Sequence, residues 1–268
     1  MKAIAILAGS LVVLLAGQPP NQDEYDQSTG NKCGMAGTAS SAAGKTLNQL
    51  KNRYRSPTAQ AFDADVSLAA LLAPGDDVDR FDDQKAAKVS GYVVGVKSGG
   101  KEACNCEATA PVDRDTHIEL ALSKNAPETQ RVIVEVTPRL RAQMKAQAVD
   151  WTTATLQKKL QGKWVEVSGW LLFDSMHVAE AENTNPGGNK NWRATCWEIH
   201  PITAMNVLTA PPANAAVVSP QVLAAFHRTH ARQTARDAKK KSALQKRNQE
   251  LLGQFDKAEL EEEKDHPE

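Results

Sequence analysis

The sequence predicts a mainly β fold, with one small closed barrel of five strands over residues 85–209 and a charged helix after it. Five segments of the barrel region are rich in β-branched and aromatic residues, and polar, turn-rich runs separate them. Between the third and fourth segments the apolar residues change from a strand period to a helical period. Gly91 and Gly169 lie inside two of the segments, where a small barrel needs tight bends.

The first three strands are expected at Lys88–Lys97, Asp115–Leu122 and Arg131–Val136. The third is nearly all β-branched, which favours an extended backbone. Pro138 follows it and has no N–H to donate to a sheet, so we expect the sheet to stop there.

One helix is expected from Arg139 to Leu160, because the apolar residues in that range recur at a period near 3.6. Gly162 is a usual helix end. The fourth and fifth strands are expected at Trp164–Phe173 and Arg193–Leu208. The order is therefore three strands, a helix and two strands.

This order resembles the OB fold, a five-stranded barrel whose familiar form carries a helix between its third and fourth strands. The segment is similar to OB-fold domains of nucleic-acid-binding proteins and of uncharacterised exported bacterial proteins. The resemblance covers under half of the chain and rests on element order and strand chemistry. It implies a ligand on the face of strands two and three, between the first-to-second and fourth-to-fifth strand loops. Another small mixed barrel is the alternative.

The composition changes on both sides of the barrel. Residues 18–84 are polar, small and Asp-rich, which predicts a partly ordered arm against the barrel. Residues 210–220 include two consecutive prolines and several alanines, which are typical of a linker. Residues 221–268 are rich in helix formers and in charge, and predict a long solvated helix.

Residues 1–17 indicate export. A lysine followed by a short apolar run is typical of a secretory signal peptide. The run is short for a membrane span, but the residues before the expected cleavage point fit poorly, so an N-terminal membrane anchor is the alternative. We expect a periplasmic or extracellular protein, which contacts a membrane only if this segment stays uncleaved.

Export favours disulfides between the four cysteines, because oxidising compartments preserve them. Cys104 and Cys106 are separated by one residue, so we expect them to pair outward, with Cys33 and Cys196. The sequence leaves the connectivity open. The Cys-x-Cys spacing does not match a zinc motif.

Histidines and carboxylates on the strands suggest a divalent metal site. The strand period of two places Asp115, His117 and Glu119 on one face of the second strand. It also places Glu198 and His200 on one face of the last strand. With His177, the histidines are candidate metal ligands, and Glu119 or Glu198 is the candidate base of a metal-assisted hydrolase, for instance on a phosphodiester. No recognised metal-binding spacing supports this hypothesis.

The function that the sequence favours is binding without catalysis. Lys plus Arg and Asp plus Glu are both 32, so net charge gives no general attraction to nucleic acid. The loops at 98–114 and 174–192 are long and polar, and their ligand is expected to be nucleic acid, an oligosaccharide or a protein. A third hypothesis is a structural adaptor that works through the C-terminal helix. The candidate binding residues are Arg114, Asn183, Asn185, Lys190, Trp192 and Arg193.

Overall fold

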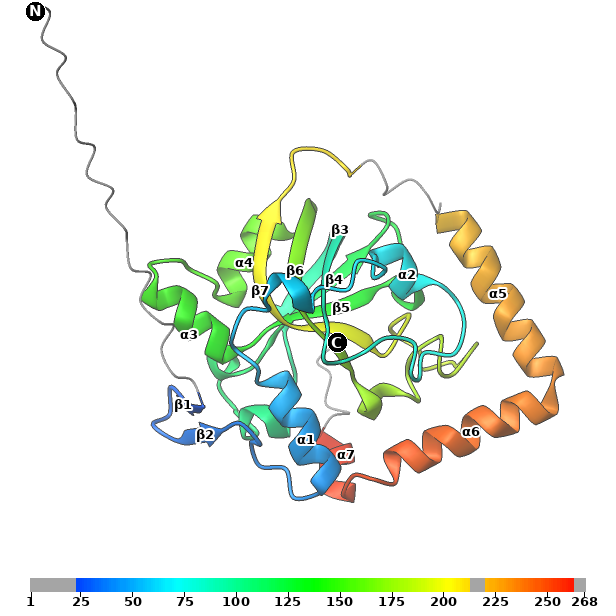
Figure 1. The fold of residues 1–268 in the computed structure, drawn as a ribbon, viewed down its shortest axis with the longest axis horizontal. Coiled ribbons are helices and arrows are strands. Elements are labelled where there is room, and N and C mark those ends of the chain that lie inside the picture. Colours follow the sequence, from blue (N-terminus) through cyan, green and yellow to red (C-terminus); the bar gives the residue numbers. More distant parts are fainter. Residues whose placement is uncertain (1–22, 213–219, 263–268) are drawn as a thin grey trace, which may run out of the picture.

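Five strands close into one barrel at the centre of the structure (Figure 1). The computed structural model describes residues 23–212 and 220–262. The barrel strands are β3 (Ala86–Ser98), β4 (Thr116–Ala121), β5 (Val132–Val136), β6 (Trp164–Phe173) and β7 (Trp197–Val207). Their order around the barrel is β3-β4-β5-β7-β6; β5 and β7 pair in parallel, and the other pairs are antiparallel. The predicted five-stranded barrel is confirmed.

The strand period of two separates the barrel core from its outer face. Ile118, Val134 and Ile199 are fully buried in the core cluster. Their neighbours along the same strands therefore point out of the barrel. The polar residues that the sequence analysis placed on these strands lie on that outer face.

The predicted close approach at a barrel glycine is confirmed at Gly169. The β6 and β7 register is irregular between Ser168 and Leu171. A Cβ on Gly169 would lie 2.2 Å from the carbonyl oxygen of Pro201, which is far inside van der Waals contact. Only glycine allows the two strands to meet there.

Two helices, not one, lie between the third and fourth barrel strands. α3 spans Pro138–Ala146 and α4 spans Thr153–Leu160, so the prediction of one helix over 139–160 is wrong. The backbone of Ala148 is left-handed, with a φ of 59°, and a helix cannot continue through it. Asp150 then accepts a hydrogen bond from the Thr152 amide just before α4 begins.

The N-terminal arm has more structure than the predicted partly ordered segment. It holds β1 (Glu24–Asp26), β2 (Lys32–Gly34), α1 (Ala42–Lys51) and α2 (Leu68–Leu72). It cannot bury a core alone, but five of its side chains join the core of the barrel. They are Tyr54, Val66, Leu68, Leu71 and Leu72.

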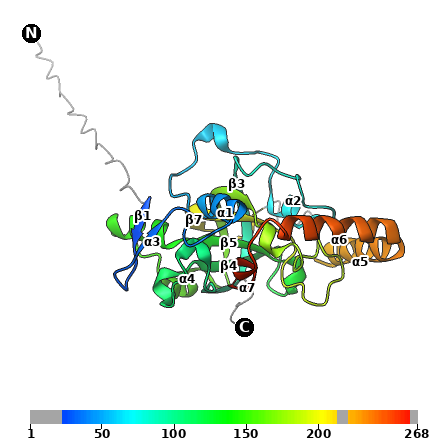
Figure 2. The ribbon, with the colours of Figure 1, turned by 90° about the horizontal axis from the view of Figure 1, so that it is seen from below.

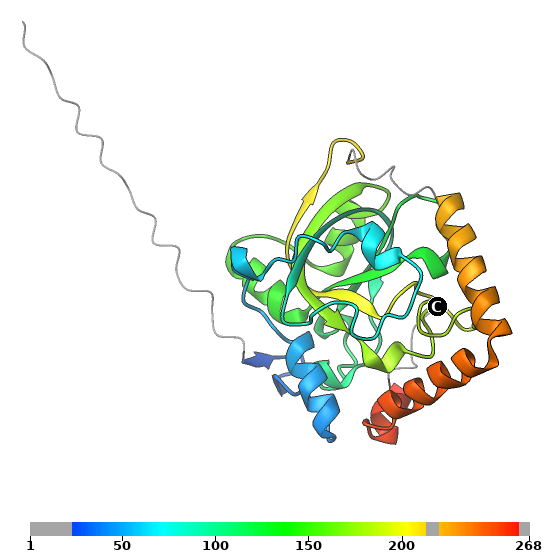
Figure 3. The ribbon, with the colours of Figure 1, turned by 45° about the vertical axis from the view of Figure 1, so that its right-hand side comes forward.

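The C-terminal region forms three helices that bend around the barrel (Figures 2 and 3). They are α5 (Pro220–Arg236), α6 (Ala238–Leu252) and α7 (Lys257–Glu262), which we call the clasp. The expected single helix is wrong, because the region forms three helices, but most of their side chains are exposed, as the prediction of a solvated helix requires. Asp237 caps the start of α6. The clasp also contacts the rest of the chain. Asn248 donates to two carbonyl groups of the 174–196 loop, and Glu259 accepts from the backbone N–H of Ser40.

The predicted segment 1–17 and most of the predicted linker lie outside the described residues. Within residues 23–212 and 220–262, no helix has the length and apolar character needed to cross a membrane.

One disulfide joins the arm to the loop between β3 and β4. Cys33 on β2 is bonded to Cys106, which confirms one of the outward pairings. The second expected bridge does not form. Cys104 and Cys196 are buried thiols, and Cys196 lies under the 174–196 loop beside Thr184.

We predict that replacing Cys33 and Cys106 by alanine lowers the free energy of unfolding. The bridge closes a loop across a sequence separation of 73 residues, which corresponds to roughly 4 kcal/mol of lost chain entropy in the unfolded state. Urea unfolding of the double variant measures the loss. An unchanged midpoint and slope would contradict the role given to the bridge.

We predict that acid loosens the clasp through His227 on α5, which is buried. Desolvation lowers its pKa to about 4, and repulsion from His230 and Arg80 acts in the same direction. The unfolded imidazole protonates near pH 6.5, so the stability gained from the neutral ring is complete above that pH and is lost as pH falls toward 4. Between pH 7 and 5, the free energy of unfolding of the wild-type protein should fall by about 1 kcal/mol more than that of His227→Leu, after allowance for solvent screening. Urea unfolding at each pH measures the difference. Parallel pH profiles for the two proteins would refute this.

Candidate metal centre

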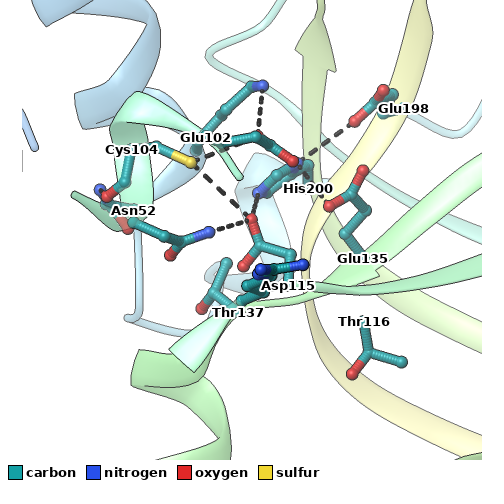
Figure 4. A network of polar contacts seen from close by, with 12 residues as sticks. Asn52, Glu102, Cys104, Asp115, Thr116, Glu135, Thr137, Glu198 and His200 are labelled. Atoms are coloured by element: carbon teal, nitrogen blue, oxygen red, sulfur yellow. Dashed lines mark hydrogen bonds and ion pairs between the residues drawn. The ribbon is translucent and has the colours of Figure 1, made fainter. Parts of the chain in front are cut away.

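Ionisable side chains meet on the outer face of the barrel, where β4, β5 and β7 lie side by side. His117 on β4 is paired in register with Glu135 on β5. Because β5 pairs in parallel with β7 on its other side, Glu198 and His200 reach the same face. Asp115, one residue before β4, completes the group (Figure 4).

Two segments from outside the barrel strands cover this face. The loop between β3 and β4 turns through a short 3-10 helix, Ala103–Asn105, which brings Glu102 and Cys104 to the face. The last turn of α1 brings Lys51. Each residue of the resulting polar cluster is at most 5 % exposed: Lys51, Glu102, Cys104, Asp115, His117, Glu135, Glu198 and His200.

The two histidines of the polar cluster share Glu135 as a neighbour, and each also lies close to other carboxylates. His117 Nε2 is 3.1 Å from Glu135 Oε1 and 3.7 Å from Glu102 Oε1. His200 Nδ1 is 3.2 Å from Glu198 Oε2 and 3.6 Å from Glu135 Oε2. Its other nitrogen, Nε2, is 3.8 Å from Asp115 Oδ2. Glu135 therefore lies between the two imidazoles.

Carboxylates outnumber cationic side chains around this face. Lys51 Nζ lies 2.9 Å from Glu102 and 3.0 Å from Asp174, and Arg193 forms an ion pair with Glu198. The buried guanidinium of Arg139 adds a third positive charge, and it donates to carbonyl groups of β2. The buried carboxylates are Glu102, Asp115, Glu135, Asp174 and Glu198. Their charge is balanced when protons are bound within the cluster, on the two histidines above all, or when a cation lies among the carboxylates.

The excess of carboxylates over cationic side chains raises the pKa values of both histidines of the cluster. Desolvation lowers the pKa of His200, but nearby carboxylates, Glu135 above all, outweigh it and raise the value to about 9. The pKa of His117 rises well above its usual value because Glu135 and Glu102 outweigh its desolvation. Burial raises the pKa of Asp115 to about 7. Without a bound cation, both imidazoles are thus protonated at neutral pH.

Several buried polar atoms of the cluster make no hydrogen bond within the described part of the chain. They include Asp115 Oδ1, Glu135 Oε2 and His200 Nε2. Buried polar atoms in folded proteins are nearly always hydrogen-bonded, so these three atoms indicate that a ligand satisfies buried groups of the cluster. A cation suits two acceptor oxygens and an imidazole nitrogen.

The described residues form three sets whose candidate ligand atoms all lie within 4.8 Å of one another. An ion with metal–ligand bonds of about 2.0–2.1 Å in a tetrahedral arrangement holds its ligand atoms about 3.3 Å apart. The contacts of 3.1–3.8 Å around the two histidines are close to that spacing. The three sets are Glu102–His117–Glu135, Asp115–Glu135–His200 and Glu102–Cys104–Asp115.

The structure brings together two of the three histidines predicted as ligands. His117 and His200 are in the polar cluster, whereas His177 lies 3.0 Å from Glu180 and packs edge-on against Trp192. The expected convergence of His177 with the other two in one ligand set is wrong, because the 174–196 loop carries its imidazole to a separate carboxylate. The other ring nitrogen of His177, Nε2, lies 3.8 Å from Asp174 Oδ2.

The two candidate bases have other partners. Glu119 shares the outer face of β4 with His117, as predicted, but it pairs with Arg131 at 2.8 Å. Glu198 is in the cluster, where Arg193 holds its pKa well below the usual range against the effect of burial. A carboxylate of that kind is a weak base, and catalysis by either residue stays a prediction.

Most of the candidate binding residues hold the loops together. Arg193 and Asn183 are completely buried, so their expected exposure to a ligand is wrong: Arg193 pairs with Glu198, and Asn183 donates to Asp77. Arg114 and Asn185 donate to loop carbonyl groups, and the half-buried Trp192 donates to Glu180. Lys190 is exposed.

Sequence reasoning missed three residues of the polar cluster: Glu135 and Glu102, which belong to the ligand sets, and Lys51, which pairs with Glu102. Glu135 is the only acidic residue of β5, whose other residues are apolar. The alternation of side chains along a strand could have placed it on the same face of the sheet as His117. Glu102 and Lys51 come from segments far apart in the sequence, and no local pattern connects them with the strands.

No family model matches the chain, and no curated protein matches it. Two solved structures of Entamoeba histolytica asparaginyl-tRNA synthetase are similar at 12 % and 11 % identity, both with a TM-score of 0.25. The second is a complex with asparaginyl-adenylate. The matches cover 53 % and 57 % of this chain but only 24 % and 26 % of the synthetase chains. Likeness at this level carries no functional argument.

We predict that Arg193→Met destabilises the protein by roughly 3–5 kcal/mol, because it leaves Glu198 buried without its cation. Chemical unfolding measures the change. Lys190→Met, in the same loop but exposed, is the matched control and should change stability by less than about 0.5 kcal/mol. Equal effects of the two substitutions would contradict the assigned ion pair.

Proposed function

We propose that this chain is an exported OB-barrel protein that binds a divalent transition-metal ion in the polar cluster. The observation that carries the proposal is the set of buried atoms Asp115 Oδ1, Glu135 Oε2 and His200 Nε2, which have no hydrogen-bond partner in the described residues. These residues also form one of the compact ligand sets. An ion among them supplies the missing partner and replaces the protons on the histidines as the charge that balances the buried carboxylates.

The ligand chemistry selects a class of metal. Each histidine-containing set offers one imidazole and two carboxylates. Imidazole nitrogen suits zinc and iron, and carboxylates also suit manganese, whereas calcium prefers a shell made of oxygen alone. We therefore propose zinc, manganese or iron in the divalent state as the bound ion.

The covered face favours a small ligand over a macromolecule. In OB folds the face of the second and third strands usually binds the ligand, and here β4 and β5 are those strands. The loop between β3 and β4 and the end of α1 lie over it, and the Cys33–Cys106 bridge joins that loop to the arm. A nucleic acid, an oligosaccharide or a partner protein would have to displace both. A bound metal ion needs no such opening.

Export is part of the proposal. The apolar N-terminal run is typical of a signal peptide. The Cys33–Cys106 disulfide is compatible with an oxidising compartment. An adaptor role for the clasp is a weaker hypothesis, because its helices already use side chains such as Asn248 and Glu259 to bind the rest of the chain.

Metal analysis of the purified full-length chain tests the proposal. After chelation and dialysis against Zn²⁺ or Mn²⁺, we expect the protein to retain metal. At a free ion concentration of about 100 Kd, binding adds about 2.7 kcal/mol of stability, or roughly 5–10 °C in Tm for a chain of this size.

A matched pair of variants locates the ion. Glu135→Gln removes the carboxylate shared by both histidine sets and should abolish retention of metal and the rise in Tm. Glu119→Gln makes the same chemical change on the same outer face, outside the polar cluster, and should leave both unchanged. Absence of metal from folded wild-type protein, with no shift in Tm, would refute the proposal, as would equal loss in the two variants.

A further inference from the structure

The two histidines of the polar cluster belong to different ligand sets. His117 groups with Glu102 and Glu135, and His200 groups with Asp115 and Glu135. No set formed by the described residues contains both imidazoles, so one ion cannot take both nitrogens without rearrangement. Glu135 is the residue that the two sets share.

The two oxygens of Glu135 have separate neighbours. Oε1 lies 3.1 Å from His117 Nε2, and Oε2 lies 3.6 Å from His200 Nδ1. Glu135 reaches this position because its strand, β5, lies between β4 and β7 in the barrel. A carboxylate with one oxygen on each side has the arrangement of a bridging ligand between two metal ions.

We propose that the centre binds two divalent metal ions bridged by Glu135, one with Glu102 and His117 and the other with Asp115 and His200. The inference rests on the proposed function and adds a second ion to it. Carboxylate-bridged pairs of this kind hold their ions about 3.5–4 Å apart.

Each ion has a carboxylate of its own in addition to the shared one. Glu102 comes from the loop over the face, with Oε2 paired to Lys51 and Oε1 turned toward His117. Asp115 accepts from Asn105 through Oδ2, and its Oδ1 makes no hydrogen bond among the described residues. Glu102 therefore keeps Oε1 on the side of His117, and the Asp115 oxygen close to His200 is Oδ2, which lies 3.8 Å from Nε2.

The third set, Glu102–Cys104–Asp115, has a simpler explanation. The Cys104 thiol donates to Glu102 Oε2 at 3.3 Å, and it lies 3.8 Å from Asp115 Oδ2. These contacts satisfy the Cys104 thiol without an ion. It also lacks an imidazole, so we assign no third ion to it.

Stoichiometry tests the inference on the wild-type full-length chain. Chelated protein is dialysed against Zn²⁺, and bound zinc is measured per chain by mass spectrometry. We expect two equivalents. One equivalent would overturn the inference and leave the proposed function standing. If no zinc binds, the same dialysis is made with Mn²⁺ and Fe²⁺, and a chain that binds none of the three ions would overturn both.

Matched histidine variants assign the two ions. His117→Gln and His200→Gln should each reduce two equivalents to one, whereas His177→Gln, whose ring lies outside the ligand sets, should keep two. Circular dichroism and Tm select the variants that fold. If a folded His117→Gln or His200→Gln still binds two equivalents, the assignment is wrong.

Manganese gives a readout that does not depend on variants. In the wild-type protein loaded with Mn²⁺, ions about 3.5–4 Å apart couple magnetically, and we expect an electron paramagnetic resonance spectrum broader than the six lines of isolated Mn²⁺. A six-line spectrum at full loading would contradict the shared Glu135 bridge.

Discussion

Burial of several carboxylates on one outer face of the barrel is the constraint on which the rest of the structure depends. A buried charge costs several kcal/mol unless a partner compensates it, and here Glu102, Asp115, Glu135 and Glu198 are nearly inaccessible to solvent. Lys51 and Arg193 each neutralise part of this charge. The remainder requires either protons on the two histidines or a bound cation, and the atoms of the cluster that lack hydrogen bonds favour the cation.

The segments outside the barrel explain how such a cluster stays closed. The arm contributes core side chains, and α1 ends at Lys51, which reaches into the cluster. The disulfide joins the arm to the loop that carries Glu102. At the other end of α1, Glu259 of the clasp accepts from the hydroxyl of Ser41, the N-cap residue. Connections far apart in the sequence thus hold α1 and the loop between β3 and β4 over this face of the barrel, which explains why the face is covered and not open.

The sequence predicted the barrel well, because alternation and β-branched composition act locally: β6 has the expected bounds, and β5 begins one residue after the expected start. The helix break at Ala148 has no glycine or proline to mark it, so the pattern suggested one helix. His117 and His200 were identifiable from their strands. Glu102 and Lys51 were not, because tertiary structure alone brings them there. Arg193 and Asn183 showed the opposite problem: their polar character suggested ligand contacts, but the loops use them internally.

The most direct test is anomalous diffraction at the zinc edge from crystals of the full-length chain grown with Zn²⁺. The account predicts anomalous density within about 2.0–2.2 Å of Glu135 and of a cluster histidine. Zinc bound only at exposed surface residues, with the polar cluster unchanged and free of anomalous density, would contradict it.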